Sequence, residues 1–195
     1  SAERAIEDAR ESIARQLNCK PVEIIFTGSG TESDNLALRG AAWARRERGT
    51  HLITTQIEHS AILRTSEQLD SLMGFAYSLL PVDGLGTVRG ADFAATIRPD
   101  TTVASVMYVN NEVGTVEPIT QLAALAHEHG IIFHTDAVQA AGQLSLDVQE
   151  LGVDLMSLSA HKFGGPKGSG VLYLKRATPF RPLLHGGGQE MQKRA

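Results

Sequence analysis

The chain has 195 residues, of which 42% are hydrophobic and 21% are charged, with a formal net charge of −4. This composition is typical of a soluble globular chain with one sizeable core, and the mild acidity argues against nucleic acid or an anionic membrane as the main partner. No apolar run approaches the roughly 20 residues of a membrane span, no signal-peptide pattern opens the chain, and the single cysteine, Cys19, suits a reducing cytoplasm.

Helical and strand patterns alternate along the whole chain. The first segment predicts an amphipathic helix with Ile6, Ala9, Ile13 and Leu17 on one face. Strands are then predicted at 22–28, 51–56, 75–82, 101–109, 131–136, 154–160 and 170–175, and helices at 31–48, 60–73, 91–97 and 119–130.

Several of these predicted strands are apolar throughout, as is typical of strands covered by helices on both faces. The alternation predicts an α/β fold: a three-layer, doubly wound, largely parallel sheet, with residues 1–195 forming a single domain. Ligands of such folds bind at the carboxyl ends of the strands. We therefore expect any chemistry in the loops that follow the strands.

The first of these loops, TGSGTESDN at 27–35, combines two glycines with hydroxyl side chains. Gly28 and Gly30 allow a tight turn, Ser29 and Thr31 add hydroxyls, and the next helix offers unpaired N–H groups to an anion. The loop lacks the third glycine of a dinucleotide fingerprint and the Gly-Lys-Ser/Thr of a Walker A loop. A plain capped strand–helix turn remains the alternative.

Four later strand ends also carry polar or ionisable side chains. Each has an ordinary structural alternative: a helix-entry histidine, a turn asparagine, a helix-capping aspartate and a solvated loop lysine. The side chains are His59, Asn110, Asn111, Asp136, Gln139, Ser159, His161 and Lys162.

Few ligands require this whole set of groups. A phosphorylated pyridine aldehyde does, because a lysine can form a Schiff base with it and a carboxylate can hold its protonated ring nitrogen. Amides would bind the ring hydroxyl, an imidazole would stack on the ring, and the strand–helix turn would take the phosphate. Each piece is weak evidence alone, and the combination is specific.

Two competing functions fail on spacing. The segment HGGGQ at 185–189 resembles the oxyanion loop of lipases, but the chain has no G-x-S-x-G nucleophile elbow. His127 and His129 lie two residues apart on a predicted helix and so face different directions, which predicts no metal site.

Six segments together resemble the NifS/IscS group of cysteine desulfurases, which are pyridoxal-phosphate enzymes with the fold of aspartate aminotransferase. The resemblance runs from about Val22 to Gln189. The segments are FTGSGTESDNLAL, EHSAIL, YVNNEVGTVEPI, HTDAVQAAGQ, MSLSAHKFGGPKGSGVLYL and HGGGQE.

The resemblance implies a role for each candidate residue. Lys162 holds pyridoxal 5′-phosphate and acts as the base at the substrate α-carbon, while Asp136 pairs with the pyridine nitrogen. Asn111 and Gln139 flank the ring hydroxyl and the substrate, and His59 stacks on the ring and is the candidate for moving a proton. The residues implied to hold the phosphate are Gly30, Thr31, Ser159 and His161.

The resemblance also implies the reaction: L-cysteine gives its sulfur to an enzyme cysteine, leaving alanine and a persulfide that supplies iron–sulfur clusters or thiolated tRNA. The expected partners are L-cysteine and a sulfur-acceptor or scaffold protein, and the full-length relatives are homodimers. The alternatives are a selenocysteine lyase, another class V aminotransferase relative and a non-catalytic domain that binds pyridoxal phosphate.

One departure from the family pattern is large. The family's nucleophilic cysteine lies beyond HGGGQE, whereas this chain ends at Ala195. We therefore expect residues 1–195 to be the cofactor-binding large domain, without the family's N-terminal segment and small C-terminal domain. Cys19 precedes the first predicted strand. Because a strand rises about 3.3 Å per residue, Cys19 should lie on the order of 20 Å from the loop at 27–35 that is implied to hold the phosphate. The fragment is expected to bind cofactor weakly, if at all, and not to desulfurate cysteine.

Overall fold

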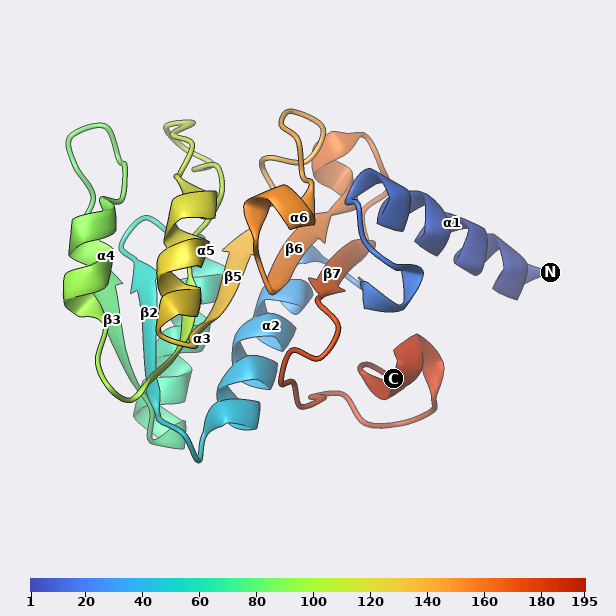
Figure 1. Ribbon diagram of the computed structural model, residues 1–195. Helices are drawn as coiled ribbons and strands as arrows, with labels where there is room; N and C mark the ends of the chain where they lie inside the picture. The colour runs from blue at the N-terminus through green and yellow to red at the C-terminus, as the bar shows by residue number, and fades with distance from the viewer.

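The computed structural model describes residues 1–195 and contains one sheet of seven strands in the order β1-β7-β6-β5-β4-β2-β3 (Figure 1). β2 pairs in parallel with β3 and β4, and the parallel pairing continues through β5 to β6, while β7 runs antiparallel to both β6 and β1. The predicted, largely parallel α/β sheet is confirmed. The strands are β1 (Ile24–Thr27), β2 (His51–Thr55), β3 (Ala76–Leu80), β4 (Thr101–Ser105), β5 (Ile132–Asp136), β6 (Leu155–Ser159) and β7 (Gly170–Leu174).

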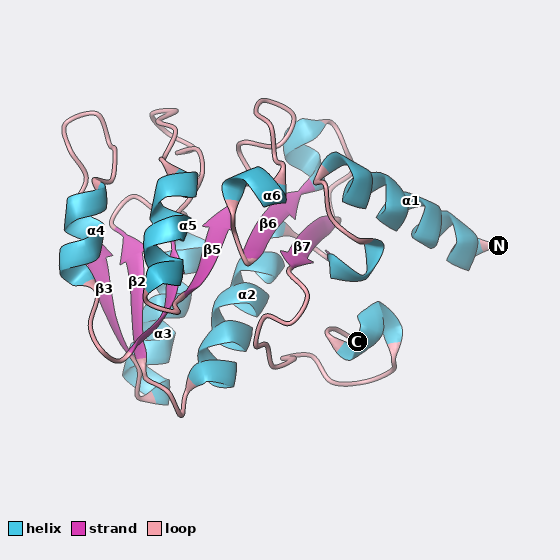
Figure 2. Ribbon diagram, in the orientation of Figure 1, coloured by secondary structure: helices cyan, strands magenta, loops and turns pink.

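Helices cover both faces of this sheet. In the view of Figure 2, α4, α5 and α6 lie in front of the sheet and α2 and α3 lie behind it. Two hydrophobic clusters, of 25 and 15 buried residues, fill the two interfaces. The helices are α1 (Ala2–Gln16), α2 (Gly30–Arg45), α3 (Ser60–Met73), α4 (Gly90–Thr96), α5 (Ile119–Glu128) and α6 (Val148–Leu151), with short 3-10 turns at Pro21–Glu23, Ala160–Phe163 and Gln189–Gln192.

The continuously apolar strand patterns correspond to strands buried along their whole length. Every residue of β2, β4, β5, β6 and β7 is buried, while the edge strands β1 and β3 are buried only in part. The strand predicted at 101–109 ends earlier, at Ser105. Beyond it, the N–H of Met107 donates to the Glu58 carboxylate at 2.7 Å rather than to a neighbouring strand.

The antiparallel direction of β7 has a simple geometric cause. Only residues 160–169 connect β6 to β7, and a parallel connection needs a crossover of about a dozen residues or more, usually a helix. The chain therefore turns back beside β6. As a result, Gly170 pairs with Thr27 of β1 on one side and with Ser159 of β6 on the other.

The apolar face predicted for α1 is wrong in part. Ile6 is 48% exposed, whereas Arg10 is 5% exposed and Ala14 and Leu17 are buried. The Arg10 guanidinium is buried because it donates to the Ile24 carbonyl and to both Glu190 carboxylate oxygens. Glu190 belongs to the HGGGQE segment, so this ion pair attaches the C-terminal residues to α1.

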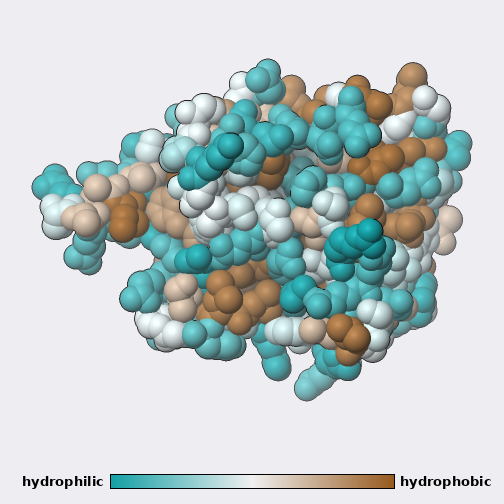
Figure 3. Space-filling model, turned by 180° about the vertical axis from the view of Figure 1, so that it is seen from behind, coloured by the Kyte–Doolittle hydropathy of each residue, from teal (hydrophilic) through white to brown (hydrophobic).

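The outer surface is mixed in character. Seen from behind, it is mainly hydrophilic, and its hydrophobic groups lie in separate patches (Figure 3). None of the helices combines the length and hydrophobicity that crossing a bilayer requires.

Truncation of Phe93, an aromatic residue of α4, tests the packing of this helix against the sheet. Phe93 is fully buried and contacts Phe133 of β5 edge-to-face, with 6.3 Å between ring centroids. Phe93→Ala should lower the free energy of unfolding by about 3–5 kcal/mol, because it leaves a cavity as well as losing buried apolar area. Urea unfolding followed by circular dichroism measures this loss.

Leu85→Ala is the matched control for this prediction. Leu85 is 79% exposed, so its truncation should change the free energy of unfolding by less than about 0.5 kcal/mol. Equal losses in the two variants would contradict the packing described for α4.

Candidate functional site

A cavity of about 250 Å³ lies at the carboxyl edge of the sheet. All nine residues to which the family resemblance gave a role line it, although they come from five separate loops. They are Gly30, Thr31, His59, Asn111, Asp136, Gln139, Ser159, His161 and Lys162. Four further residues complete the lining: Ser29, Asp34, Met107 and Val138. Of these, the sequence had suggested only the Ser29 hydroxyl as a part of the site.

The turn before α2 has the features of an anion site. Ser29 is the N-cap of α2, and its hydroxyl accepts the N–H of Glu32 at 3.1 Å. The N–H groups of Gly30 and Thr31 donate no hydrogen bond within the chain. The capped-turn alternative is therefore correct as a description of the backbone, and the same turn leaves two N–H groups at a helix N-terminus for an anion.

Two glycines let this turn pack against the ends of the sheet. A Cβ on Gly30 would lie 2.8 Å from Val138 Cγ2, and a Cβ on Gly170 would lie 2.6 Å from the carbonyl carbon of Ser29. Both distances are shorter than real Cβ contacts, so any side chain would push the turn away from β6 and β7. These two glycines keep the turn beside the lysine loop.

Asp136 ends β5 and is 5% exposed. No helix follows it. Its Oδ1 instead accepts the N–H of Val138 at 2.9 Å and so shapes a turn. Burial raises the pKa of the Asp136 carboxyl, and the Val138 N–H and the positive charges of His59 and Lys162 oppose that shift. A carboxylate here would form a strong interaction with a cationic ligand in the cavity.

His59 has both the structural role and the cavity position that the sequence allowed. Its Nδ1 accepts the N–H of Ala61 at 3.1 Å and thereby caps the N-terminus of α3. In the neutral imidazole, the hydrogen is therefore on Nε2. The cap fixes the ring orientation, because the Nδ1 side is held against the backbone.

The two adjacent asparagines in the loop after β4 have different roles. Asn110 Oδ1 accepts the N–H groups of Glu112 and Val113 at 2.9 and 3.0 Å, and Asn110 Nδ2 donates to the Ile57 carbonyl at 3.0 Å. Asn110 is thus the turn residue of the loop, and Asn111 is the asparagine that lines the cavity.

Glu58 joins the loops that carry His59 and Asn111. It is 7% exposed, and its Oε1 accepts both the Met107 N–H at 2.7 Å and the Thr55 hydroxyl at 3.2 Å. Burial and the charge of Asp136 raise the pKa of the Glu58 carboxyl well above its usual value. The sequence had suggested no role for Glu58, because neither its burial nor its contact with the Met107 N–H, 49 residues away, is visible in a local pattern.

The lysine loop begins with a 3-10 turn rather than a flexible coil. Ser159 Oγ lies 2.9 Å from His161 Nδ1, and the turn spans Ala160–Phe163. Lys162, within this turn, lines the cavity, whereas Lys167 does not. The glycines come after the turn, with Gly164 at φ +88°.

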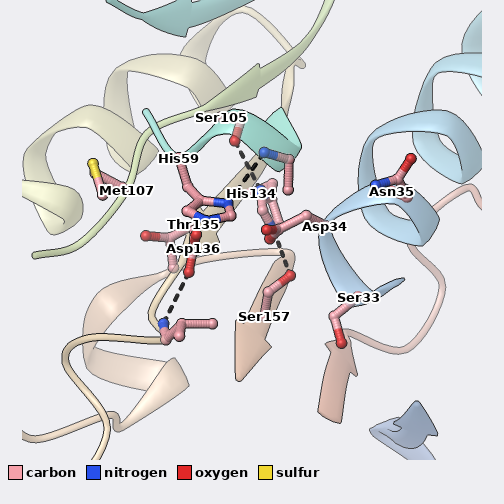
Figure 4. Close-up of polar contacts among 12 residues, drawn as sticks. Ser33, Asp34, Asn35, His59, Ser105, Met107, His134, Thr135, Asp136 and Ser157 are labelled. Atoms are coloured by element: carbon pink, nitrogen blue, oxygen red, sulfur yellow. Dashed lines mark hydrogen bonds and ion pairs between the residues drawn. The ribbon is translucent and has the colours of Figure 1, made fainter. Parts of the chain in front are cut away.

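A row of buried polar side chains lies beneath the cavity (Figure 4). His134 of β5 lies between Asp34 and Asp136, with Ser105 Oγ 2.8 Å from its Nδ1 and Ser157 Oγ 2.9 Å from its Nε2. Sequence reasoning missed Asp34. A signal existed, since Asp34 lies four residues after Gly30 and so on the same helical face.

Other candidates lie outside the cavity. Cys19 is not among its lining residues, and burial raises the pKa of the Cys19 thiol to about 12. No group of three or more His, Cys, Asp and Glu side chains is arranged to hold a metal ion. His127 instead pairs with Asp154 at 2.8 Å.

Comparison with known proteins gives a consistent result. The family model described as "Aminotransferase class-V" matches residues 1–194. A protein of Dictyoglomus turgidum named "Cysteine desulfurase IscS" is 51% identical over 191 residues, which is 98% of this chain and 48% of that protein. The chain therefore spans about half the length of the curated relatives it matches.

Two solved structures have the same fold. A structure titled "SspA in complex with cysteine" superposes with a TM-score of 0.95 at 44% identity, covering 99% of this chain and 56% of that one. A structure titled "NIFS-LIKE PROTEIN" superposes with a TM-score of 0.95 at 41% identity, covering 100% of this chain and 53% of that one.

Pyridoxal 5′-phosphate is the cofactor of class V aminotransferases, and the donors of the cavity fit its groups. The turn at Gly30 offers free N–H groups to a phosphate, Asp136 offers a carboxylate to a protonated ring nitrogen, and Lys162 offers an amine to an aldehyde. The match over residues 1–194 shows that this chain belongs to the class V aminotransferase family.

Proposed function

We propose that residues 1–195 are the cofactor-binding large domain of a cysteine desulfurase that depends on pyridoxal 5′-phosphate. The observation that carries this proposal is the convergence of Lys162, Asp136 and an anion-binding turn in one cavity. The substrate, L-cysteine, is supported by the name of the Dictyoglomus turgidum relative and by the cysteine in the SspA structure. The reaction would yield alanine and protein-bound sulfur.

Each group of the cofactor has a complementary group in this cavity. The N–H groups of Gly30 and Thr31, with the side chains of Ser159 and His161, would bind the phosphate. When bound, pyridoxal phosphate supplies an aldehyde carbon that bonds to an amine and a pyridinium ring that withdraws electrons. Asp136 would accept a hydrogen bond from the ring nitrogen and keep that nitrogen protonated.

The remaining cavity residues would orient the ring and the substrate. His59, with its Nδ1 held by Ala61, would present the imidazole plane to the ring. Asn111 and Gln139 would hydrogen-bond the ring hydroxyl, since both amides reach the cavity. Lys162 Nζ would hold the cofactor and would move the proton at the substrate α-carbon.

Sulfur transfer requires a thiolate within bonding reach of the substrate sulfur. No cysteine lines the cavity, and the thiol of Cys19 is protonated at neutral pH because its pKa is raised to about 12. We therefore assign the sulfur-accepting role to no residue of this chain. The proposed partner is a sulfur-acceptor protein or an iron–sulfur scaffold protein, and the sulfur would also serve tRNA thiolation. We further propose that the full-length protein is a homodimer in the cytoplasm.

The first test identifies the lysine that bonds the cofactor. The chain is incubated with excess pyridoxal phosphate, reduced with borohydride and mapped by peptide mass spectrometry. The pyridoxyl group should be on Lys162, because Lys162 lines the cavity and Lys167 does not. Lys162→Ala should lose the label and Lys167→Ala should keep it. A label on Lys167 alone would contradict the assignment.

The second test concerns Asp136. Asp136→Asn keeps the shape of the side chain and removes its charge, so cofactor affinity should fall about 10- to 150-fold, the equivalent of the about 1.5–3 kcal/mol of a hydrogen bond to a charged group. Absorbance titration with pyridoxal phosphate measures the affinity. Asp70→Asn, an exposed change on α3, is the control and should leave the affinity as it was.

The third test concerns sulfur transfer. With pyridoxal phosphate and L-cysteine but no thiol other than this substrate, the 195-residue chain should release neither sulfide nor alanine, because no cysteine of the chain lines the cavity. Cys19→Ser should behave in the same way. Turnover in the wild-type chain that disappears in Cys19→Ser would make Cys19 the nucleophile, and the proposed placement would be wrong.

A further inference from the structure

Asp34 is the second buried carboxyl of the cavity and has no role in the function proposed above. It is 1% exposed and points from α2 toward His134, while its neighbour Asn35 points away and accepts a hydrogen bond from Thr65 (Figure 4). Asp34 also lines the cavity, so its carboxyl belongs to the same site as Asp136.

Asp34 has fewer hydrogen-bond donors than an ionised carboxyl needs, since only the Ser157 hydroxyl acts to lower its pKa through a hydrogen bond. No hydrogen-bond donor contacts its Oδ1, and the nearest candidate for a positive charge, His134 Nε2, is 3.8 Å away. His134 supplies no positive charge, because burial lowers its pKa to about 3 and Ser105 and Ser157 occupy both ring nitrogens. An ionised and unpaired carboxylate in this position would be strongly unfavourable.

Asp136 lies in the same cavity with better partners. It accepts the Val138 N–H and interacts with the positive charges of His59 and Lys162. Burial and the charge of Asp136 raise the pKa of Asp34 well above its usual value, and the hydroxyl of Ser157 opposes this shift. When two nearby carboxyls share one proton, the proton lies on the carboxyl whose ionised form has fewer stabilising partners.

We propose that Asp34 is a positioning residue: it holds a proton throughout the neutral pH range and so leaves Asp136 as the single anionic carboxyl of the cavity floor. This arrangement suits a ligand with one cationic ring nitrogen, since two carboxylates would attract a second cation or proton. The protonation follows from the surroundings of Asp34 itself, and only the link to the cofactor rests on the function proposed above.

Infrared spectroscopy tests the proton on Asp34 directly. A protonated carboxylic acid has a carbonyl stretch above the amide I band, and a carboxylate does not. At neutral pH, the difference spectrum of wild type minus Asp34→Asn should contain this band. Glu58→Gln identifies the separate band of Glu58, and Asp136→Asn should retain the band of Asp34. Absence of the band from the first difference spectrum would overturn the proposal.

The pH dependence of thermal stability is the second readout. Because the pKa of folded Asp34 is raised, its contribution to stability is fully present below the unfolded value of about 4 and is lost progressively as pH rises toward the folded value. Between about pH 5 and 8, the Tm of Asp34→Asn should therefore rise steadily relative to the Tm of wild type. A Tm difference that does not change with pH would contradict a proton held on Asp34, because a purely structural role gives such a constant difference.

Addition of pyridoxal phosphate connects this inference with the proposed function. In the wild-type chain, the Asp34 band should persist once the cofactor has bound, because Asp136 carries the charge that pairs with the ring. Loss of the band on binding would show that Asp34 is the ring partner and would overturn the proposal. If the absorbance spectrum shows no binding, cofactor binding by residues 1–195 is contradicted, and the spectra of the protein alone still decide where the proton lies.

Discussion

Parallel pairing of β2, β4, β5 and β6 forces the carboxyl ends of these strands to one edge of the sheet. The loops after them carry His59, Asn111, Asp136 and Lys162, so residues far apart in the sequence share one cavity. The antiparallel strand β7 completes the arrangement, because Gly170 pairs with the ends of both β1 and β6. The turn before α2 and the lysine loop are neighbours for this reason.

The polar row inside the sheet determines the charge of the cavity floor. Ser105, His134 and Ser157 lie on three adjacent strands and satisfy one another, which leaves no cation for Asp34 and no donor for its Oδ1. Asp136 accepts a backbone N–H and lies near His59 and Lys162, which act to lower its pKa. The two carboxyls are chemically identical in isolation, and their surroundings alone make them different.

Neighbouring residues in the site loops have complementary tasks. Asn110 forms the turn and Asn111 faces the cavity; Glu58 fixes the loop backbone and His59 lines the cavity. A loop that presents a side chain needs a second side chain to satisfy its own backbone groups. Short polar motifs at strand ends therefore contain more polar residues than the ligand itself requires.

The sequence by itself determined the alternation of helices and buried strands and the polar residues at the strand ends, because both depend on local periodicity and turn chemistry. Together with the resemblance that they carry, those strand ends named nine residues that line one cavity. Only the tertiary structure decided the burial of Arg10 and the contact of buried Glu58 with the Met107 N–H. Each depends on a partner distant in the sequence, and a local pattern carries no information about which distant groups pack against it.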